Sequence, residues 1–248
     1  MTTSFYLMNT VNWKKNDTLV ISDVHIGIRN NQVKKLCNFL NLVLENPPKR
    51  VVVNGDLFEL WSANYKSMDI YDYKVIRRLI KLSEIGIKLV FIPGNHDWAF
   101  RAFKTIHIGK IKILNEYAID DYKKKYVVLH GDEFDAFTRN NIVLSLLIDK
   151  LYLLLIKATA FLKRLFRMNF ALYARNHSEK YKKQVARIKK AALKYAHSAK
   201  VDGIIIGHTH WPEIFIDIDG VIYANSGDWL DNCSYLVVGE EIKLHYYN

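Results

Sequence analysis

Five short polar motifs contain the side chains in this chain that are best suited to bind a metal ion. Each motif contains histidine, aspartate or asparagine, and together they hold five of the nine histidines. In chain order, the motifs are Asp23-Val24-His25, Gly55-Asp56, Gly94-Asn95-His96-Asp97, His130-Gly131-Asp132 and Gly207-His208-Thr209-His210. Imidazole and carboxylate together suit Mn, Fe or Zn, whereas a structural zinc site would be expected to contain thiolates. The motifs therefore predict a metal centre without thiolate ligands.

Seven of these polar side chains are more ligands than one ion would need. Two divalent ions roughly 3.5–4 Å apart, sharing one carboxylate, would use all of them. Proteins use such a pair of ions to stabilise the attacking and leaving oxygens of an in-line displacement at phosphorus. The sequence therefore indicates two divalent metal ions and a reaction on a phosphate ester or anhydride.

A strand-like stretch precedes each motif. The five stretches are short and rich in β-branched residues, which is typical of buried strands: TLVIS, VVVN, LVFIP, YVVL and GIII. Amphipathic helices are predicted between the first three, from about 31 to 45 and from about 69 to 84. This alternation predicts a parallel sheet, and such sheets place ligand sites just past the carboxyl ends of their strands. We therefore expect the motifs to converge.

The rest of the chain predicts further strands around a helical insert. IKIL, EYAI and KKYVVL predict short strands before His130, and a hairpin turning at Asp219-Gly220 follows the last motif. CSYLVVG and EEIKLHYY predict two closing strands. The α/β fold expected for residues 1–248 is a single domain in which two packed sheets carry flanking helices.

Residues 138–200 form the predicted insert, or cap. Nearly every residue from 141 to 166 is apolar, and a second helix, from about 178 to 199, is strongly basic. From Arg139 to Lys200 the chain carries 15 lysines and arginines against two acids, whereas the remainder carries 21 against 23. The net charge of +11 therefore belongs to this segment. It indicates an anionic partner: a membrane surface, a phosphorylated substrate or nucleic acid.

The N-terminus and the cysteines bear on the compartment. The first residues lack a basic start followed by an apolar core, so no secretory signal is expected. Cys37 and Cys233 match no redox or zinc spacing and are interpreted as buried thiols. The expectation is a cytoplasmic protein, and the insert is consistent with a peripheral position at the inner face of the membrane.

The five motifs, in this order, resemble those of the calcineurin-like metallophosphoesterase superfamily. The resemblance implies a four-layer αββα sandwich. It also implies the following ligands: Asp23, His25 and His210 for one ion, Asn95, His130 and His208 for the other, and Asp56 bridging both. The implied nucleophile is a hydroxide that bridges the two metals and attacks phosphorus in line.

His96 stands where the family places a histidine that does not bind metal. The resemblance implies that it stabilises charge developing on the phosphate or protonates the leaving oxygen. Asp97 or Glu59 would orient it, and the sequence does not choose between them. Glu59 falls in Gly55-Asp56-x-x-Glu59, which is similar to the family's GDxx(D/E) pattern.

Most of the chain resembles the UDP-2,3-diacylglucosamine hydrolase branch of this superfamily. The resemblance rests on GDLFELW, HGDEF and GHTHWPE and on the position of the insert. Members of that branch release UMP and a phosphorylated glycolipid from a lipid-linked sugar nucleotide, usually with Mn, and hold acyl chains under a helical cap. The chain departs from them at His96, where they commonly carry arginine, and GNHD with HGDEFD is more similar to a related subgroup.

Alternative interpretations of the insert stay open. A phosphodiesterase or nuclease would use its basic residues to bind the phosphates of nucleic acid or nucleotides. The leucine-rich stretch, however, lacks the interleaved aromatic and polar groups of a strand-binding groove. The apolar helix would otherwise pack on the core or on a second subunit, which leaves an oligomer open. A scaffold without activity is disfavoured because all five motifs keep their ligands.

Overall fold

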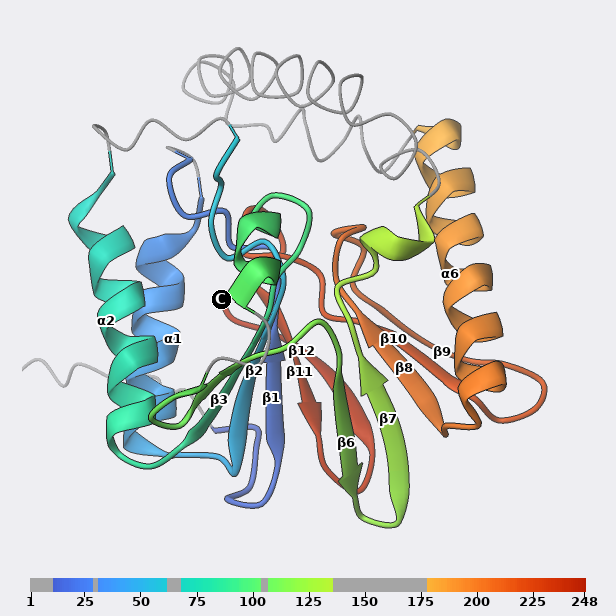
Figure 1. The fold of residues 1–248 in the computed structure, drawn as a ribbon, viewed down its shortest axis with the longest axis horizontal. Helices are drawn as coiled ribbons and strands as arrows, with labels where there is room; N and C mark the ends of the chain where they lie inside the picture. The colour runs from blue at the N-terminus through green and yellow to red at the C-terminus, as the bar shows by residue number, and fades with distance from the viewer. Residues whose placement is uncertain (1–10, 29–30, 62–67, 104–106, 136–177) are drawn as a thin grey trace, which may run out of the picture.

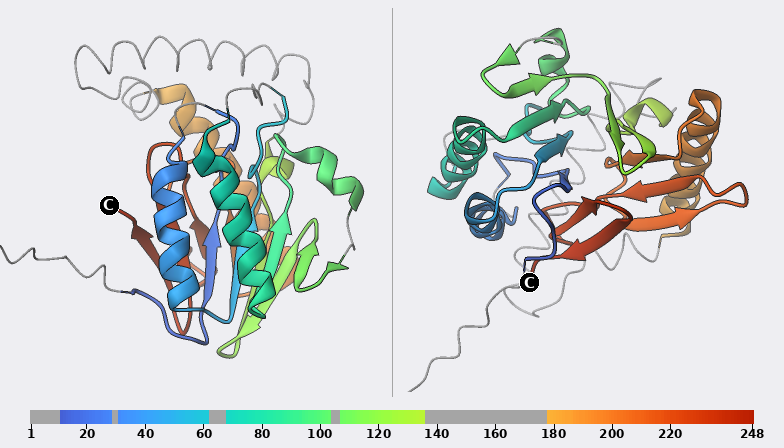
Figure 2. Two further views of the ribbon diagram at one scale, coloured as in Figure 1. Left: turned by 90° about the vertical axis from the view of Figure 1, so that its left-hand side faces the viewer. Right: turned by 90° about the horizontal axis from the view of Figure 1, so that it is seen from below.

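The computed structural model describes residues 11–28, 31–61, 68–103, 107–135 and 178–248 (Figure 1). Two β-sheets lie face to face, and helices cover the outer face of each sheet, as Figure 2 shows from two further sides. The order of the layers is helix, sheet, sheet, helix. This arrangement confirms the predicted four-layer αββα sandwich.

The first sheet contains the strands that precede the first three motifs. Its central strands, β1 (Thr18–Ile21), β2 (Arg50–Asn54) and β3 (Lys88–Ile92), run parallel. The sheet order is β12-β11-β1-β2-β3-β5-β4, and the other strands are β4 (His107–Ile108), β5 (Ile111–Ile113), β11 (Ser234–Val238) and β12 (Ile242–Tyr246). Because the central strands are parallel, the motifs that follow them leave the sheet at one edge.

The second sheet contains the strands that precede the last two motifs. β7 (Lys124–Val128), β8 (Gly203–Ile206) and β10 (Ile222–Asn225) run parallel in its middle. β6 (Tyr117–Asp121) and β9 (Glu213–Ile216) are antiparallel border strands, in the order β6-β7-β8-β10-β9. β9 and β10 form the predicted hairpin.

Helices α1 (Val33–Glu45) and α2 (Ile70–Glu84) cover the first sheet. The predicted apolar face of α1 is buried, together with one thiol: Val33, Leu36, Cys37, Phe39, Leu40 and Val43. At the start of α2, Asp69 accepts a hydrogen bond from the Tyr71 N–H, and Asp72 accepts one from the Asp69 N–H. This capping box satisfies N–H groups at the helix start that lack a partner within the helix.

The helix α6 (Glu179–Ala199) forms the fourth layer, on the outer face of the second sheet (Figure 2). Buried side chains join the two: Ile188, Ala192 and Ala196 of the helix pack with Ile204, Ile206 and Tyr223 of the sheet. The basic helix predicted within 138–200 is therefore a layer of the sandwich. The apolar helix predicted over 141–166 lies outside the described residues. In the part of the chain that the structure describes, no helix combines the length and apolarity needed to cross a bilayer.

Candidate metal centre

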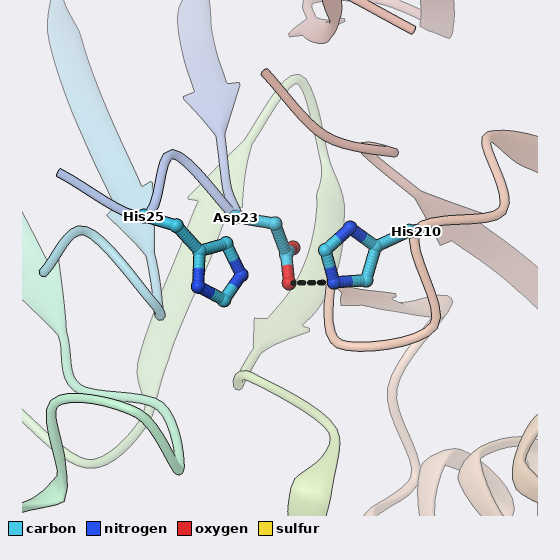
Figure 3. Close-up of side chains that lie close together, drawn as sticks. All are labelled: Asp23, His25 and His210. Atoms are coloured by element: carbon cyan, nitrogen blue, oxygen red, sulfur yellow. Dashed lines mark ion pairs between the residues drawn. The ribbon is translucent and has the colours of Figure 1, made fainter. Parts of the chain in front are cut away.

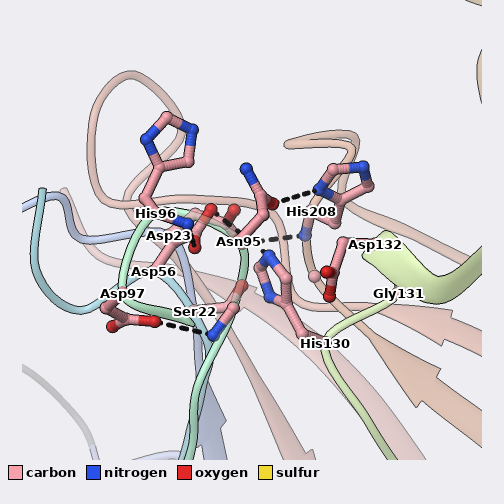
Figure 4. A network of polar contacts seen from close by, with 12 residues as sticks. Ser22, Asp23, Asp56, Asn95, His96, Asp97, His130, Gly131, Asp132 and His208 are labelled. Atoms are coloured by element: carbon pink, nitrogen blue, oxygen red, sulfur yellow. Dashed lines mark hydrogen bonds and ion pairs between the residues drawn. The ribbon is translucent and has the colours of Figure 1, made fainter. Parts of the chain in front are cut away.

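The five motifs meet where the parallel strands of both sheets end (Figure 4). Within the first sheet, the Asp23 N–H donates to the Gly55 carbonyl at 3.1 Å, and within the second, the Gly207 N–H donates to the His130 carbonyl at 2.8 Å. Between the sheets, the His208 N–H donates to Oδ2 of Asp23 at 3.1 Å. Backbone hydrogen bonds therefore fix the motif loops relative to one another.

Asp23, His25 and His210 form the first cluster of possible ligands (Figure 3). They offer ligand atoms that all lie within 4.8 Å of one another. Oδ1 of Asp23 is 3.4 Å from Nε2 of His210, and the rings of His25 and His210 stack with centroids 5.4 Å apart. Asp23 and His25 are buried. These are the three side chains that the family resemblance implies for one ion.

Asp56, His130 and His208 form the second cluster (Figure 4). Oδ1 of Asn95 joins it, because this oxygen lies 3.0 Å from Nδ1 of His208. Oδ2 of Asp56 is 3.2 Å from Nε2 of His130 and 3.9 Å from Nε2 of His25 in the first cluster. The structure thus brings together all seven predicted ligands and places Asp56 between the two clusters.

The side chains of the two clusters fit divalent metal ions. Asp23 Oδ1 and His25 Nε2 are buried polar atoms that make no hydrogen bond within the described residues, although they face His210 and Asp56 at 3.4 and 3.9 Å. A buried polar atom without a hydrogen bond costs about 1–3 kcal/mol. A cation bound between them would satisfy both atoms. The donor set of carboxylate, imidazole and amide oxygen also suits the ions that the motifs predict.

The ring of His96 lies beside the first cluster, with its centroid 4.7 Å from that of His25. Nδ1 of His96 is 2.7 Å from Oε2 of Glu59, and the same oxygen is 3.2 Å from Nδ1 of His25. Burial alone would raise the pKa of Glu59, but its contacts with the two imidazoles outweigh burial and hold this pKa well below its usual range. An ionised Glu59 therefore positions both rings, so proton transfer by His96 would use Nε2.

Asp97 is fully buried and joins the second and third motifs. Its Oδ1 accepts a hydrogen bond from the Gly94 N–H at 2.6 Å, and its Oδ2 accepts from the N–H groups of Leu57 and Phe58 at 2.8 and 3.2 Å. Burial and the nearby Asp56 carboxylate raise the pKa of Asp97 to about 7, against the effect of these hydrogen bonds. Glu59 therefore contacts the His96 ring, whereas Asp97 holds the backbone N–H groups of the loops after β2 and β3.

Asp56 and His130 stabilise each other's charge in the metal-free protein. Burial would raise the pKa of Asp56, but His130, His96 and His25 outweigh burial and hold it well below its usual range. Burial would lower the pKa of His130, but Asp56 raises it well above its usual value. Because a metal ligand must be an unprotonated nitrogen, metal binding here would release a proton from His130.

The calcineurin-like phosphoesterase family model matches residues 17–212 of this chain. The matched range spans all five motifs, from Asp23 to His210. The chain belongs to the calcineurin-like phosphoesterase family. It is therefore a metal-dependent hydrolase of phosphate esters or anhydrides, and the predicted enzyme class is confirmed.

Relatives of this phosphoesterase confirm the predicted resemblance to one branch. UDP-2,3-diacylglucosamine hydrolases of Yersinia enterocolitica and Yersinia pestis are each 26% identical to this chain over 211 residues, 79% of this chain and 83% of theirs. Among solved structures, an archaeal phosphodiesterase gives a TM-score of 0.47 at 10% identity, covering 92% of this chain and 98% of its own. Vps29 from Chaetomium thermophilum gives 0.47 at 12%, covering 94% and 98%.

The backbone of this phosphoesterase is strained at its predicted ligands. Five of them have a positive φ between 51° and 60°: Asp23, His25, Asp56, His208 and His210. Non-glycine residues rarely adopt this left-handed conformation, which costs of order 1–3 kcal/mol each and is concentrated at functional sites. Both end residues of Asp-x-His and of His-x-His have this conformation, and the side chains of all four belong to the two clusters. No pattern of residue types predicts it.

His210→Gly is expected to be about 1 kcal/mol more stable than His210→Ala in the metal-free protein. Both variants lose the imidazole contacts with Asp23 and Asp228. The difference between their free energies of unfolding therefore reports the cost of the positive φ of 53° at this position. Urea unfolding after removal of metal by EDTA measures the difference. At Lys182, inside α6, the order should reverse, because glycine is unfavourable within a helix. An alanine variant that is the more stable one at both positions would contradict this explanation.

Glycines in the motifs allow the ligand side chains to approach closely. A Cβ atom on Gly94 would overlap with Oδ1 of Asp56 and lie 2.6 Å from Nε2 of His130. A Cβ atom on Gly207 would lie 2.6 Å from Oδ2 of Asp23. The second cluster therefore has no room for any larger residue at Gly94.

Gly94→Ala is expected to lose most bound metal and activity, because Asp56 and His130 must move to admit the methyl group. Metal analysis after gel filtration and hydrolysis of an aryl phosphodiester measure both losses. Gly86→Ala is the matched control. Gly86 also has a positive φ, of 92°, but nothing lies within 4 Å of an added Cβ. It should cost about 1 kcal/mol of stability and keep the metal. Full metal content in Gly94→Ala would contradict the close packing.

Three buried residues that the motifs do not single out hold predicted ligands. Oδ2 of Asp228 lies 3.2 Å from Nδ1 of His210, and the Asn54 carbonyl lies 2.9 Å from Nδ1 of His130. Oδ2 of Asp135 lies 3.3 Å from Nε2 of His208. Asp228 follows β10 at the edge of the sheet where the motifs meet. Asn54 ends β2, whereas a single aspartate such as Asp135 has no spacing that would identify it.

Proposed function

We propose that this protein is a two-metal phosphoesterase or pyrophosphatase whose substrate is a lipid-linked sugar nucleotide such as UDP-2,3-diacylglucosamine. The position of Asp56 carries the two-metal part of the proposal. Its Oδ2 lies 3.2 Å from Nε2 of His130 in one cluster and 3.9 Å from Nε2 of His25 in the other. A carboxylate shared by both clusters is what two closely spaced cations need, because it offsets their repulsion.

Each predicted ligand has one place in this proposal. Asp23, His25 and His210 would hold the first ion, Asn95, His130 and His208 would hold the second, and Asp56 would be shared by both. When bound, the two ions supply a nucleophile at neutral pH and polarise the phosphoryl oxygen. His96, positioned through Nδ1 by Glu59, stabilises charge on the phosphate or gives the leaving oxygen its proton from Nε2. Manganese is the proposed ion, with iron or zinc as alternatives.

Aromatic side chains beside the clusters support a substrate with apolar parts. The indole N–H of Trp61 donates to the Asn95 carbonyl at 2.8 Å, and its ring centroid lies 6.5 Å from that of His96. Trp211 directly follows His210, and its ring lies 6.0 Å from that of Tyr181. Sites that hold a large ligand combine such apolar surfaces with a few polar groups. The curated relatives, named UDP-2,3-diacylglucosamine hydrolases, support the choice of a sugar nucleotide.

We also propose that residues 138–200 bring the enzyme to the inner face of a membrane as a peripheral protein. The apolar stretch 141–166 would accept acyl chains or enter the interface. Exposed basic residues of α6, such as Lys182 and Lys183, would meet anionic headgroups. The relatives' substrate is a lipid by name, which supports this placement.

Deletion of residues 141–166 is expected to abolish binding to anionic liposomes, because the apolar stretch is the proposed contact with the interface. It should spare hydrolysis of bis(p-nitrophenyl) phosphate, because the described ligands all lie outside this range. Liposome flotation and aryl ester turnover measure the two effects, and bound metal per chain is the control. Flotation equal to that of the intact protein would show that another part of the chain binds the membrane.

A nuclease is the second candidate, and the basic surface of α6 favours it. Lys182, Lys183, Arg187, Lys190 and Lys194 are all exposed on this helix. A row of cations of this kind could contact successive phosphates, and binding would then weaken steeply with salt. DNA and RNA cleavage measured across a salt series would support this candidate if turnover exceeded that on the sugar nucleotide.

The experiment that tests the proposed substrate is UMP release from UDP-2,3-diacylglucosamine by the Mn-loaded protein in detergent micelles. The Asp56→Ala protein, treated in the same way, is the control for contaminating activity. Release by the wild type alone is the expected result. No release, with hydrolysis of bis(p-nitrophenyl) phosphate retained, would refute this substrate and keep the reaction class. Hydrolysis of neither would count against the proposed site.

A further inference from the structure

The imidazole of His208 contacts a different acceptor at each of its two nitrogens. Nδ1 lies 3.0 Å from Oδ1 of Asn95, the amide assigned to the same ion. Nε2 lies 3.3 Å from Oδ2 of Asp135. Asp135 is buried, and it directly follows the 3-10 turn η3 (Asp132–Phe134) after the fourth motif. This contact therefore joins a residue outside the five motifs to a predicted metal ligand.

The first turns of α6 hold both Asp135 and the His208 loop. The side-chain amide of Gln184 donates a hydrogen bond to Oδ2 of Asp135 at 2.8 Å. The Tyr181 hydroxyl donates to the carbonyl of Thr209, the residue after His208, and the Tyr181 ring lies 6.0 Å from that of Trp211. The outer layer of the sandwich is therefore joined to the last motif at two points, and the carboxylate cannot turn away from His208 without breaking the bond to Gln184.

The chemistry of imidazole gives this contact a consequence for metal binding. A neutral imidazole carries its proton on one nitrogen and binds a metal through the other. An ionised carboxylate only accepts hydrogen bonds, so Asp135 favours the form with the proton on Nε2. Nδ1 is then the unprotonated nitrogen, and it is the one that faces Asn95. Hydrogen bonding of the distal N–H to a carboxylate also raises the basicity of the ligating nitrogen.

We propose that Asp135 is a positioning residue that keeps the proton of His208 on Nε2 and so directs Nδ1 to the metal. Gln184 of α6 fixes the carboxylate in this role. The inference rests on the proposed function, because it takes His208 as a ligand of the second ion. It adds a residue outside the five motifs to the metal centre, and it makes α6 part of that centre.

Mn affinity tests the role of Asp135 without any substrate. Titration calorimetry with Mn²⁺ should show one of the two sites weakened roughly 10–100-fold in Asp135→Ala, the usual effect of removing such a hydrogen-bond partner. Asp135→Asn keeps an oxygen that can accept the Nε2 proton and should restore most of the affinity. Gln184→Ala, on the exposed side of the contact, should lose only a few-fold. It also serves as the second variant if Asp135→Ala does not fold.

Glu213→Ala is the matched control for a merely structural effect. Glu213 forms an ion pair with Lys189 at 2.7 Å, so it also joins α6 to the second sheet, but it lies in β9 and contacts no predicted ligand among the described residues. Its removal should lower the unfolding temperature of the metal-free protein and leave both Mn affinities unchanged. Equal Mn affinities in Asp135→Ala and the wild type would overturn the proposal.

The protonation of His208 gives a second, spectroscopic readout. In the Zn-loaded, ¹⁵N-histidine-labelled protein, NMR should show the proton of His208 on Nε2 and the metal on Nδ1. A metal on Nε2 would overturn the role of Asp135 and leave the proposed function intact. His208→Ala separates the two failures: if this variant kept both ions at wild-type affinity, the assignment of His208 as a ligand would itself be wrong.

Discussion

Asp56→Ala is expected to remove both metal ions and to abolish hydrolysis of every phosphoester. Asp56 is 1% exposed, and its Oδ2 lies 3.9 Å from Nε2 of His25 and 3.2 Å from Nε2 of His130. Two dications roughly 4 Å apart repel by about 16 kcal/mol at an effective dielectric constant of 20. A carboxylate between them offsets much of that energy. Alanine leaves each ion with neutral imidazoles and fewer anions, so neither site should retain its metal.

Bound metal per chain and turnover of bis(p-nitrophenyl) phosphate measure this prediction together. Asp132→Asn is the matched control, because Asp132 is also a buried carboxylate in a motif, but it pairs with Arg101 at 2.7 Å. This variant should lose stability and keep both ions. Asp56→Ala that retained one ion with wild-type affinity and measurable turnover would contradict a shared carboxylate and favour a single-metal enzyme.

The position of Asp56 could be predicted because its strand carries a local signal. Val51, Val52 and Val53 form an unbroken β-branched run, and all three are buried, as expected for a parallel strand covered on both faces. The polar Gly55-Asp56 pair marks where the run ends. Because parallel strands end at a common edge, the convergence of distant motifs follows from the composition of a few short segments.

The packing of α6 could not be predicted from its charge. Its basic residues dominate its composition, and they led to its interpretation as part of the segment 138–200 that meets an anionic partner. The stripe that fixes it to the sheet consists of only four buried side chains: Val185, Ile188, Ala192 and Ala196. Their spacing of three and four residues predicts a helix, but which surface this helix covers depends on the shape of the second sheet.

The orientation of side chains at the site depends on geometry that residue types do not contain. Glu59 fits the family's GDxx(D/E) pattern and Asp97 directly follows His96, so the sequence left both acids as possible partners of this ring. The backbone decides between them, because Asp97 is turned towards the N–H groups of Gly94 and Leu57, whereas Glu59 reaches Nδ1 of the ring. Asp135 could not be identified from the sequence at all, because its contact with His208 joins segments 73 positions apart in the chain.

His96→Ala is expected to keep both metal ions and to slow turnover by roughly 10²–10⁴, the usual contribution of a positioned general acid. The contact of Nδ1 with Glu59 is the physical reason, because it fixes the ring beside the first cluster and leaves proton transfer to Nε2. The loss should be largest for esters whose leaving alcohol has a high pKa. It should be small for p-nitrophenyl esters, because their leaving oxygen needs no proton.

Glu59→Gln distinguishes positioning from proton transfer. Glu59 contacts both His96 and His25, so its replacement should weaken the first metal site as well as slow turnover, whereas His96→Ala should do only the second. The cluster of His25, Asp56 and His96 offers the opposing possibility that His96 is itself a ligand. If His96→Ala lost an ion, and if turnover fell equally for p-nitrophenyl and alkyl esters, His96 would be a metal ligand and not a general acid. The dependence of turnover on the leaving-group pKa therefore decides the role of His96. Metal content alone does not decide it, because an indirect shift of the neighbouring ligand His25 would change metal content as well.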